Sequence, residues 1–155
     1  MARAGDQLVN SISGERIVFR RTAGDTAGEL LEMDAHWARP GRRTPEHRHP
    51  CMEERWEVIA GCACFRVGGV EQMSGPGDTA VALPGVTHEA WNSGEEPAHV
   101  RIQMRPALRW ELFVERLFAL ANDAHARGCD APELESLLAL MREFPSEIAG
   151  PAPTR

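Results

Sequence analysis

Apolar and polar residues alternate along several short stretches in the first two thirds of the chain. The clearest run covers residues 31–37, LEMDAHW, in which every second residue is apolar. Similar patterns occur over residues 53–59, 63–67 and 99–105, and residues 16–20 form a further β-rich run. Because side chains of a strand point alternately to its two faces, each run predicts a strand with one buried face. Successive short strands of this kind predict a mainly β fold of the barrel type.

The periodicity changes after Pro106, where apolar residues begin to recur every three or four positions. This spacing is typical of an amphipathic helix, and it persists to about Gly128. A second helical pattern ends at Pro145, and Asp130 with Glu133 resembles a capping box at its start. The apolar positions of the two helices are Trp110, Phe113, Val114, Leu117, Leu120, Ala121 and Ala124, and then Leu134, Leu137, Leu138 and Met141.

These patterns divide the chain into a barrel domain over residues 1–106, a helical extension over 107–145 and a flexible tail over 146–155. A minimal barrel does not need the two helices. We expect their apolar stripes to pack on the outer sheet or across a dimer interface. The alternative is that one helix covers an end of the barrel and shapes a substrate entrance, as a lid does.

Length and charge limit the classes of function. At 155 residues the chain has the length of one domain and can bury a core without disulfides. Its net charge of −6 argues against a general surface for nucleic acid or anionic membranes. No stretch approaches the roughly 18 apolar residues of a membrane span, and no apolar signal segment opens the chain. The four cysteines form no Cys-x-x-Cys pair, so we expect a cytoplasmic protein.

Three histidines are candidate metal ligands. His47 and His49 lie in a stretch that is expected to be extended. Because side chains alternate along it, both imidazoles point to one face and can share an ion. A second short apolar strand ends in the Pro84-Gly85 turn, which leads to His88. This strand supplies the third imidazole.

Glu54 is the fourth candidate ligand. Pro50 cannot donate to a central strand ladder, so the chain is expected to turn over residues 50–52 and to begin a new strand near Glu53. In that strand Glu54 shares the apolar face with Trp56. This face is expected to form the barrel interior, which selects Glu54 rather than Glu53 as the ligand.

Three neutral imidazoles and one carboxylate suit one divalent transition metal per chain, and Fe, Mn, Ni, Co and Zn all remain open. Two residue types are absent, which narrows the possible reactions further. The chain contains 17 arginines but no lysine, and it contains no tyrosine. Lysine Schiff-base catalysis and a tyrosine general acid are therefore excluded. Any acid or base must be a carboxylate, an imidazole, a thiol or a metal-bound water.

The two ligand-bearing segments resemble the paired motifs of the cupin superfamily. The first motif is matched in every spacing by Gly41, His47, His49, Glu54 and Gly61. The second is matched by Gly77, Gly85, His88 and Asn92, with Leu83 where the family usually has proline. The resemblance covers about residues 14–106. It implies a small antiparallel jelly-roll barrel with a central metal and, in most members, a homodimer, but it implies no particular reaction.

Alternation also predicts which side chains surround the metal. The expected pocket residues are Trp37, Trp56, Phe65, Ile102 and Met104. Asn92 is expected to be the nearest polar group, and Glu53 is a candidate base, so both are candidate catalytic residues. Such a pocket favours a small, partly apolar or aromatic ligand that offers an oxygen to the ion.

Two functions of different classes follow from this reading. The leading hypothesis is a metal-dependent enzyme acting on a small organic substrate, through O2-dependent oxidation or through Lewis-acid isomerisation, cyclisation or elimination. The alternative is a non-catalytic protein that senses or sequesters a small ligand or metal, with the helices serving dimerisation or partner contact. Binding without turnover would favour the second.

Overall fold

The structure, a computed structural model, describes residues 1–38, 40 and 43–154. The strands in this part of the chain are β1 (Gln7–Val9), β2 (Arg16–Arg21), β3 (Leu31–Trp37), β4 (Glu53–Ala60), β5 (Ala63–Val67), β6 (Val70–Ser74), β7 (Thr79–Ala82), β8 (His88–Asn92) and β9 (Ala98–Arg105). Two helices follow them, α1 (Trp110–Ala126) and α2 (Leu134–Glu143). The predicted mainly β fold with two C-terminal helices is confirmed.

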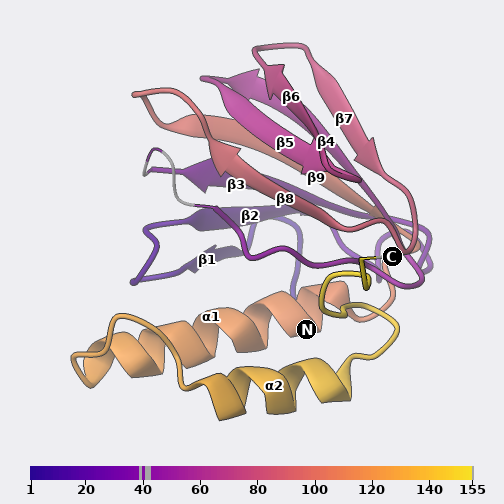
Figure 1. The fold of residues 1–155 in the computed structure, drawn as a ribbon. Coiled ribbons are helices and arrows are strands. Elements are labelled where there is room, and N and C mark those ends of the chain that lie inside the picture. The colour runs from indigo at the N-terminus through magenta and orange to yellow at the C-terminus, as the bar shows by residue number, and fades with distance from the viewer. Residues whose placement is uncertain (39, 41–42, 155) are drawn as a thin grey trace.

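The strands form two antiparallel sheets (Figure 1). The larger sheet has the order β1-β2-β3-β9-β4-β7, and the smaller has the order β6-β5-β8. β9 lies between β3 and β4, so the last strand of the barrel joins two strands from much earlier in the chain. The predicted turn before β4 is also present, because residues 50 and 51 form a turn and β4 begins at Glu53.

The core lies between the inner faces of the two sheets. In the larger sheet Ile102 of β9 pairs with Met33 of β3 on one side and with Trp56 of β4 on the other. Phe65 of β5, in the smaller sheet, stacks on Trp56 with 5.0 Å between ring centroids. The apolar positions selected by alternation therefore meet across the sandwich, as a period of two requires.

Helix α1 completes this core. Four of its buried side chains, Trp110, Phe113, Val114 and Phe118, belong to the same apolar cluster as β2. Figure 1 shows both helices on one side of the strands, with α1 running beneath β1 and β2. Asn122 of α1 donates through Nδ2 to the carbonyl of Val9 in β1, at 2.9 Å. The first helix therefore closes the open side of the barrel core and adds no layer on the outer sheet.

Helix α2 differs from its expected form in two respects. It begins at Leu134 behind Glu133, which makes no side-chain capping bond, so the capping box expected from Asp130 is not formed. Two of the four residues of its expected apolar stripe are exposed, Leu134 at 70% and Leu138 at 41%, while Leu137 and Met141 are half-buried. The buried residue of the helix is Leu140. The local sequence pattern predicted the position of the helix correctly, but it did not predict which face of the helix is buried.

A glycine of the first motif has a steric role at the end of β4. Gly61 adopts a φ of +76° in the turn to β5, and an added Cβ would lie 2.7 Å from the Pro97 carbonyl oxygen. Such a contact is too short for any larger residue, so glycine is required there. Gly41, which begins the same motif, lies outside the described residues.

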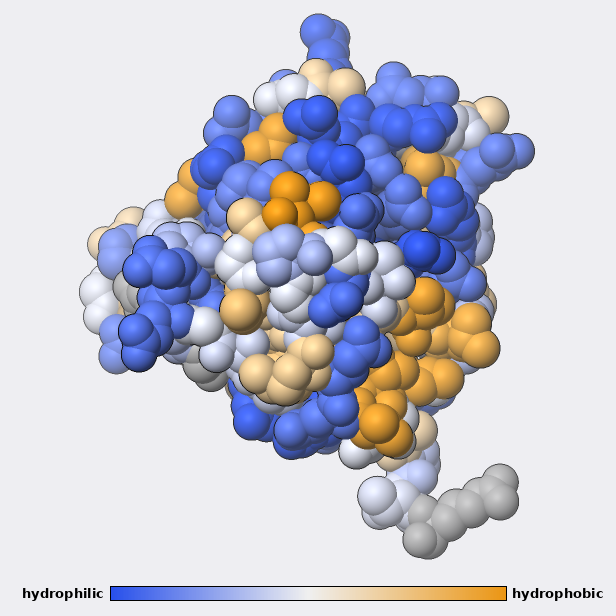
Figure 2. Space-filling view, turned by 90° about the horizontal axis from the view of Figure 1, so that it is seen from above, coloured by the Kyte–Doolittle hydropathy of each residue, from blue (hydrophilic) through white to orange (hydrophobic). Residues whose placement is uncertain are grey.

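The surface is mostly hydrophilic on the face seen in Figure 2, where apolar side chains gather beside the C-terminal tail. In the described part of the chain, no helix has both the length and the apolar character needed to cross a lipid bilayer.

Phe144, just after α2, tests whether the helical extension shares its stability with the barrel. The side chain is fully buried and its ring lies 5.5 Å from that of Phe113 in α1. We expect Phe144→Ala to lower the free energy of unfolding by about 3–5 kcal/mol, because it leaves a cavity in the common core. Leu134→Ala, at an exposed position, should change it by less than about 0.5 kcal/mol. Equal values for both variants in urea unfolding would contradict this packing.

Candidate metal centre

Backbone pairing brings two of the predicted ligands side by side. The amide of His47 donates to the carbonyl of His88 at 3.1 Å, and the amide of His88 donates back at 2.8 Å. Three residues before His47, the amide of Thr44 donates to the carbonyl of Ala90 at 3.0 Å. The amide of Ala90 donates in turn to Oγ1 of Thr44, also at 3.0 Å. The segment that carries His47 thus lies antiparallel to β8, and the paired histidines share a face of the sheet.

The other two ligands come from the turn before β4 and from β4 itself. Gly85, with a φ of +82°, donates its amide to the carbonyl of His49 at 2.8 Å, so the Pro-Gly turn holds the His49 backbone. Glu54 pairs with Met104 and Ala82 in the larger sheet and points to the inner face. One ligand atom from each of the four residues, His47, His49, Glu54 and His88, lies within 4.8 Å of the other three.

Each imidazole of the cluster is oriented by a backbone carbonyl. The Nδ1 atoms of His47, His49 and His88 lie 2.7, 2.6 and 2.9 Å from the carbonyl oxygens of Pro45, Glu147 and Val86. A carbonyl oxygen only accepts, so in each ring Nδ1 carries the proton and Nε2 is left to bind an ion. Metal-binding histidines usually donate their second ring nitrogen to such an acceptor, which fixes the tautomer of the ring.

One carboxylate oxygen faces two of these nitrogens. Oε2 of Glu54 lies 2.9 Å from Nε2 of His49 and 2.9 Å from Nε2 of His88. In the described chain the Nε2 of His88 is buried and has no aligned hydrogen-bond partner. Neutral rings whose Nδ1 atoms donate to carbonyls would direct lone pairs at a carboxylate, so a proton on Nε2 or a bound cation must lie between them. One divalent cation meets this requirement, and the four residues therefore fit a metal ion.

The pKa values of Glu54 and His47 favour the protonation states that a metal site requires. Burial lowers the pKa of His47 to about 4, so its imidazole is neutral at pH 7. Burial opposes ionisation of Glu54, but the His49 and His88 imidazoles outweigh it and hold the pKa of this carboxyl well below its ordinary value. Burial acts to lower the pKa of His88, and the Glu54 carboxylate raises it above the ordinary value. The cluster thus keeps a carboxylate ionised inside the protein, and that charge attracts a cation.

The donor set limits which ions can bind. Three imidazole nitrogens and one carboxylate oxygen suit Fe, Mn, Co, Ni or Zn, whereas calcium and magnesium prefer oxygen ligands throughout. His49, Glu54 and His88 are buried, and His47 is half-buried. The side of the cluster nearest to His47 is therefore the side on which a further ligand could approach.

Aromatic rings enclose the cluster on two sides. Trp56 lies edge-on to His88 with 5.3 Å between ring centroids, and Phe65 stacks behind Trp56. On another side Trp110, the first residue of α1, lies edge-on to His49 at 4.6 Å. Trp56 and Phe65 were expected in this neighbourhood, but Trp110 was not. The position of Trp110 in the helical pattern does not indicate which barrel residue it contacts.

Two further residues that were expected in the pocket, Ile102 and Met104, lie on the inner face of β9. Met104 pairs with the ligand Glu54, and Ile102 pairs with Trp56. Both side chains are buried, with exposed fractions of 0% for Met104 and 7% for Ile102. The strand register thus brings these two residues to the level of the cluster.

Trp37 and Asn92 lie farther away than the sequence suggests. Trp37 pairs with Ala98, at the opposite end of β9 from Met104, which corresponds to about 20 Å of strand. Asn92 is four residues beyond His88 on β8, and its Nδ2 donates to the carbonyls of Trp37 and Glu96 at 3.0 and 2.8 Å. The structure does not bring either residue to the ligands, and Asn92 instead joins loops at the far end.

Glu53 lies next to Glu54 in sequence but on the opposite face of β4, where it pairs with Arg105. This outer face has a hollow of about 350 Å³ lined by Arg55, Glu57, Arg101, Gln103 and Arg105. Glu53 therefore does not face the cluster, and this hollow lies on the other side of the sheet from it.

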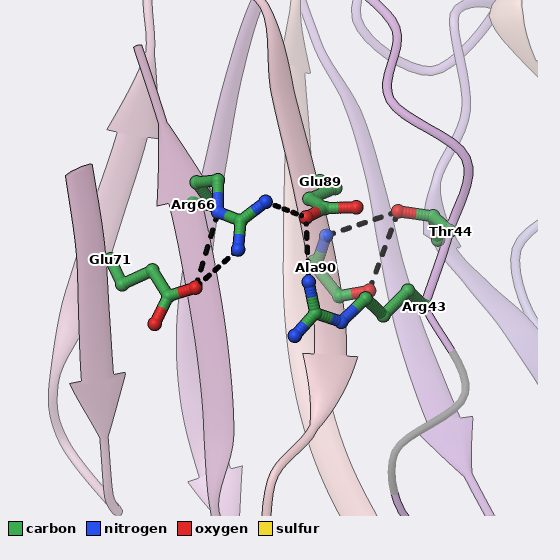
Figure 3. Close-up of polar contacts among 6 residues, drawn as sticks. All are labelled: Arg43, Thr44, Arg66, Glu71, Glu89 and Ala90. Carbon is green, nitrogen blue, oxygen red and sulfur yellow. Dashed lines mark hydrogen bonds and ion pairs between the residues drawn. The ribbon is translucent and has the colours of Figure 1, made fainter. Parts of the chain in front are cut away.

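Charged residues on the outer face of the smaller sheet hold the segment that leads to His47 (Figure 3). Nη1 of Arg43 lies 3.1 Å from Oε1 of Glu89, and Nη1 of Arg66 lies 2.7 Å from the same oxygen. The Arg43 guanidinium also stacks over the Trp91 ring, 3.9 Å from its centroid. Since Glu89 follows His88, these contacts fasten two ligand-bearing segments together from outside.

A half-open cavity of about 260 Å³ lies near the same segments. It is bounded by the β1–β2 loop, β3, β8 and α1. Among the described residues its lining consists of Asn10, Ser13, Glu15, Trp37, Arg43, Thr44, Pro45, Ala90, Leu117 and Phe118. Pro45 and Ala90 are each two residues from a ligand, His47 and His88 respectively, so the cavity borders the segments that hold the cluster.

Removal of ligand atoms tests the cluster directly. We expect wild-type protein purified without oxygen to hold about one transition-metal ion per chain. The double variant His47→Ala, Glu54→Gln should hold close to none, because it loses one donor and the charge that favours a cation. His125→Ala, on the exposed surface of α1, is the control and should match wild type. Plasma mass spectrometry measures all three, and equal metal content in the double variant would exclude this site.

Comparisons with known proteins agree with this site. The cupin domain family matches residues 38–103, a range that contains all four ligands. An uncharacterized conserved protein with a double-stranded β-helix domain from Klebsiella pneumoniae is 34% identical, over 52% of this chain and 70% of that chain, with a TM-score of 0.48.

More distant structures share the fold. One is a predicted oxalate decarboxylase from Thermotoga maritima, with a TM-score of 0.58, 15% identity and coverage of 68% of this chain and 98% of that one. Another is a sugar phosphate isomerase of the cupin superfamily from Silicibacter pomeroyi, with a TM-score of 0.54, 18% identity and coverage of 64% and 70%. No curated protein matched. The family match and the motif residues that it spans show that this chain belongs to the cupin family.

Proposed function

We propose that this protein is a metal-dependent enzyme that acts on a small organic substrate bound beside the His47, His49, Glu54 and His88 cluster. The observation that carries the proposal is the shared Glu54 oxygen, which lies 2.9 Å from two imidazole nitrogens whose rings are already fixed from behind. Holding four donors in this way costs stability, because buried polar groups without a partner are unfavourable. A bound metal would offset that cost.

The ligands would hold the metal, and the buried ones would keep water from three sides of it. When bound, the metal would supply Lewis-acid polarisation of a substrate oxygen or, with iron, access to oxidation by dioxygen. His47 is the half-buried ligand, so substrate would reach the cluster on its side. The backbone pairing of His47 with His88 would keep that side in register with the rest of the site.

The cavity of about 260 Å³ supports a small substrate with mixed polarity. Leu117 and Phe118 of α1 give it an apolar wall, and Arg43 with Thr44 gives it polar groups near the His47 segment. Ligand pockets are usually apolar with a few polar groups that fix orientation, and this one is slightly smaller than their usual volumes of roughly 300–1,000 Å³. We propose that α1 thereby helps to shape the substrate entrance, as the lid alternative requires.

The choice between oxidation and metal-assisted proton transfer depends on the metal and on the acid or base available. The chain has no lysine or tyrosine, so this role would fall to a carboxylate, an imidazole, a thiol or a metal-bound water. Glu53 and Asn92 gain no support from their placement, because one faces the outer sheet surface and the other binds backbone carbonyls. Glu15 is the carboxylate that lines the cavity.

The second candidate function is binding of a metal or small ligand without turnover. The near-complete burial of three ligands favours it, because His49 is 1% exposed, His88 is 2% exposed and Glu54 is 7% exposed. Closed coordination is typical of structural metal sites, whereas catalytic sites keep a position open. Half-buried His47 is the feature that favours the enzyme.

We also propose that the protein acts in the cytoplasm as a homodimer. The four cysteines, Cys51, Cys62, Cys64 and Cys129, are all free thiols, and Cys64 is buried. Free thiols suit a reducing compartment. Light scattering coupled to gel filtration would measure the mass of the particle, and a monomer at micromolar concentration would contradict the dimer.

Turnover by reconstituted protein tests the enzyme proposal. We expect apo protein loaded with one metal at a time to convert at least one member of a panel of small hydroxy, keto and carboxylic acids. Oxygen uptake would accompany conversion with iron, and proton-exchange or isomerisation products would appear in NMR spectra with zinc, nickel or manganese. Glu54→Gln should reduce the rate at least about 100-fold, since it removes the charge that holds the ion.

The control for that assay is a variant outside the site. His125→Ala should keep the wild-type rate, because this side chain is exposed on α1. Ligand-induced thermal stabilisation with no product under any metal would overturn the enzyme proposal in favour of a binding protein.

A further inference from the structure

We infer that the C-terminal arm, residues 146–152, is a positioning element of the metal centre that fixes the His49 ring. The inference rests on the metal site proposed above and adds to it a part of the chain outside both motifs. The family match ends at residue 103, so the arm lies beyond the segment that the comparison covers. It was also expected to be part of a flexible tail, yet its backbone is bonded to the segment that bears His47 and His49.

The arm lies along the ligand-bearing segment as an added strand would. Arg48, between the two histidines, donates its amide to the carbonyl of Ala149 and accepts from the Ala149 amide, each at 3.0 Å. Its side chain donates through Nε to the Gly150 carbonyl at 3.0 Å. Farther along, the Ala152 amide donates to Oγ1 of Thr87, the residue before His88, at 2.8 Å. The arm thus touches both segments that carry imidazole ligands.

The bond to His49 differs in kind from those to the other two histidines. His47 and His88 bond through Nδ1 to carbonyls two residues earlier in their own segments. His49 bonds instead to the Glu147 carbonyl, 98 residues later in the chain, at 2.6 Å. Local backbone geometry is therefore sufficient to orient two rings, while the third depends on the arm being in place.

An ion pair between buried Glu147 and the exposed Arg109 side chain holds the arm at this point. Glu147 is 2% exposed, and its Oε1 accepts from the amide of Arg109 at 3.2 Å and from its Nε at 3.1 Å. The same guanidinium donates to the Glu143 carbonyl at the end of α2, at 2.7 Å. Because Trp110 follows Arg109 and packs against His49, the start of α1 acts on this ring in two ways.

These contacts give the helical extension a role in metal affinity. Without the Glu147 carbonyl, no acceptor would hold the proton on Nδ1, and the His49 imidazole would be free to adopt the tautomer whose Nε2 proton faces Glu54. The metal would then lose one of four donors while the barrel strands stay paired. Changes to groups that orient a ligand usually cost about 10–100-fold in metal affinity.

The test uses full-length protein with proline substitutions in the arm. Ala149→Pro removes the amide that bonds to Arg48 and should separate the arm from the ligand segment. Thr154→Pro, at an exposed position of the same tail, is the matched control. Competition with a chromogenic chelator gives the zinc affinity, the visible spectrum of the cobalt(II) form reports on the donors, and thermal unfolding of metal-free protein reports on the fold.

We expect Ala149→Pro to weaken zinc binding about 10–100-fold and to change the cobalt spectrum, while Thr154→Pro matches wild type in both. If Ala149→Pro does not fold, Glu147→Gln serves in its place, because it keeps the size of the side chain but removes the charge that binds Arg109. Its loss of affinity should be about tenfold. Unchanged affinity and an unchanged spectrum in a folded arm variant would overturn the inference.

Failure of the proposed function gives a different result. If wild-type protein takes up no metal, the metal site is wrong, and the arm is then tested alone by nitrogen-15 NMR of the His49 ring. We expect Nδ1 of His49 to carry the proton in wild type and the protonation pattern to change in Ala149→Pro. The same pattern in both proteins would show that the arm does not orient the ring.

Discussion

A single carboxylate oxygen that faces two buried imidazole nitrogens is the constraint on which the rest of the structure depends. Oε2 of Glu54 lies 2.9 Å from Nε2 of both His49 and His88, in a core where water cannot screen it. Each ring is held from behind by a carbonyl, so neither can turn away to relieve the lone-pair contact. A buried ion without a partner is costly, and the surrounding packing is what makes the arrangement possible.

Two kinds of contact sustain it. Strand pairing sets the level of each donor, since Glu54 on β4 is level with Met104 on β9 and His88 is paired with His47. Contacts from outside the barrel then fix the remaining freedom. Arg43 on Glu89 fastens the His47 segment from the outer face, and α1 with the C-terminal arm does the same from below. The motifs alone would supply ligands without such support.

The sequence predicted that the four residues of the cluster would meet, because period-two alternation and a proline turn are local properties. The turn after Pro50 and the start of β4 at Glu53 both follow from that reasoning. Alternation predicts which face of a strand a side chain occupies, but not how far along the barrel it lies. Trp37 and Asn92 therefore share the inner side yet lie far from the ligands. A long-range contact such as that of His49 with Glu147 leaves no periodic pattern in the sequence, so only the folded structure shows it.

The separation between His49 and the carbonyl that orients it has a consequence for biosynthesis. A chain folds from its N-terminus as the ribosome releases it, so the barrel strands that carry all four ligands emerge before the residues that complete the site. A metal that arrived during translation would meet His47 and His88 with their rings already fixed locally, but not His49. Binding by all three imidazoles would therefore begin only after the arm, residues 146–152, has been made and has docked.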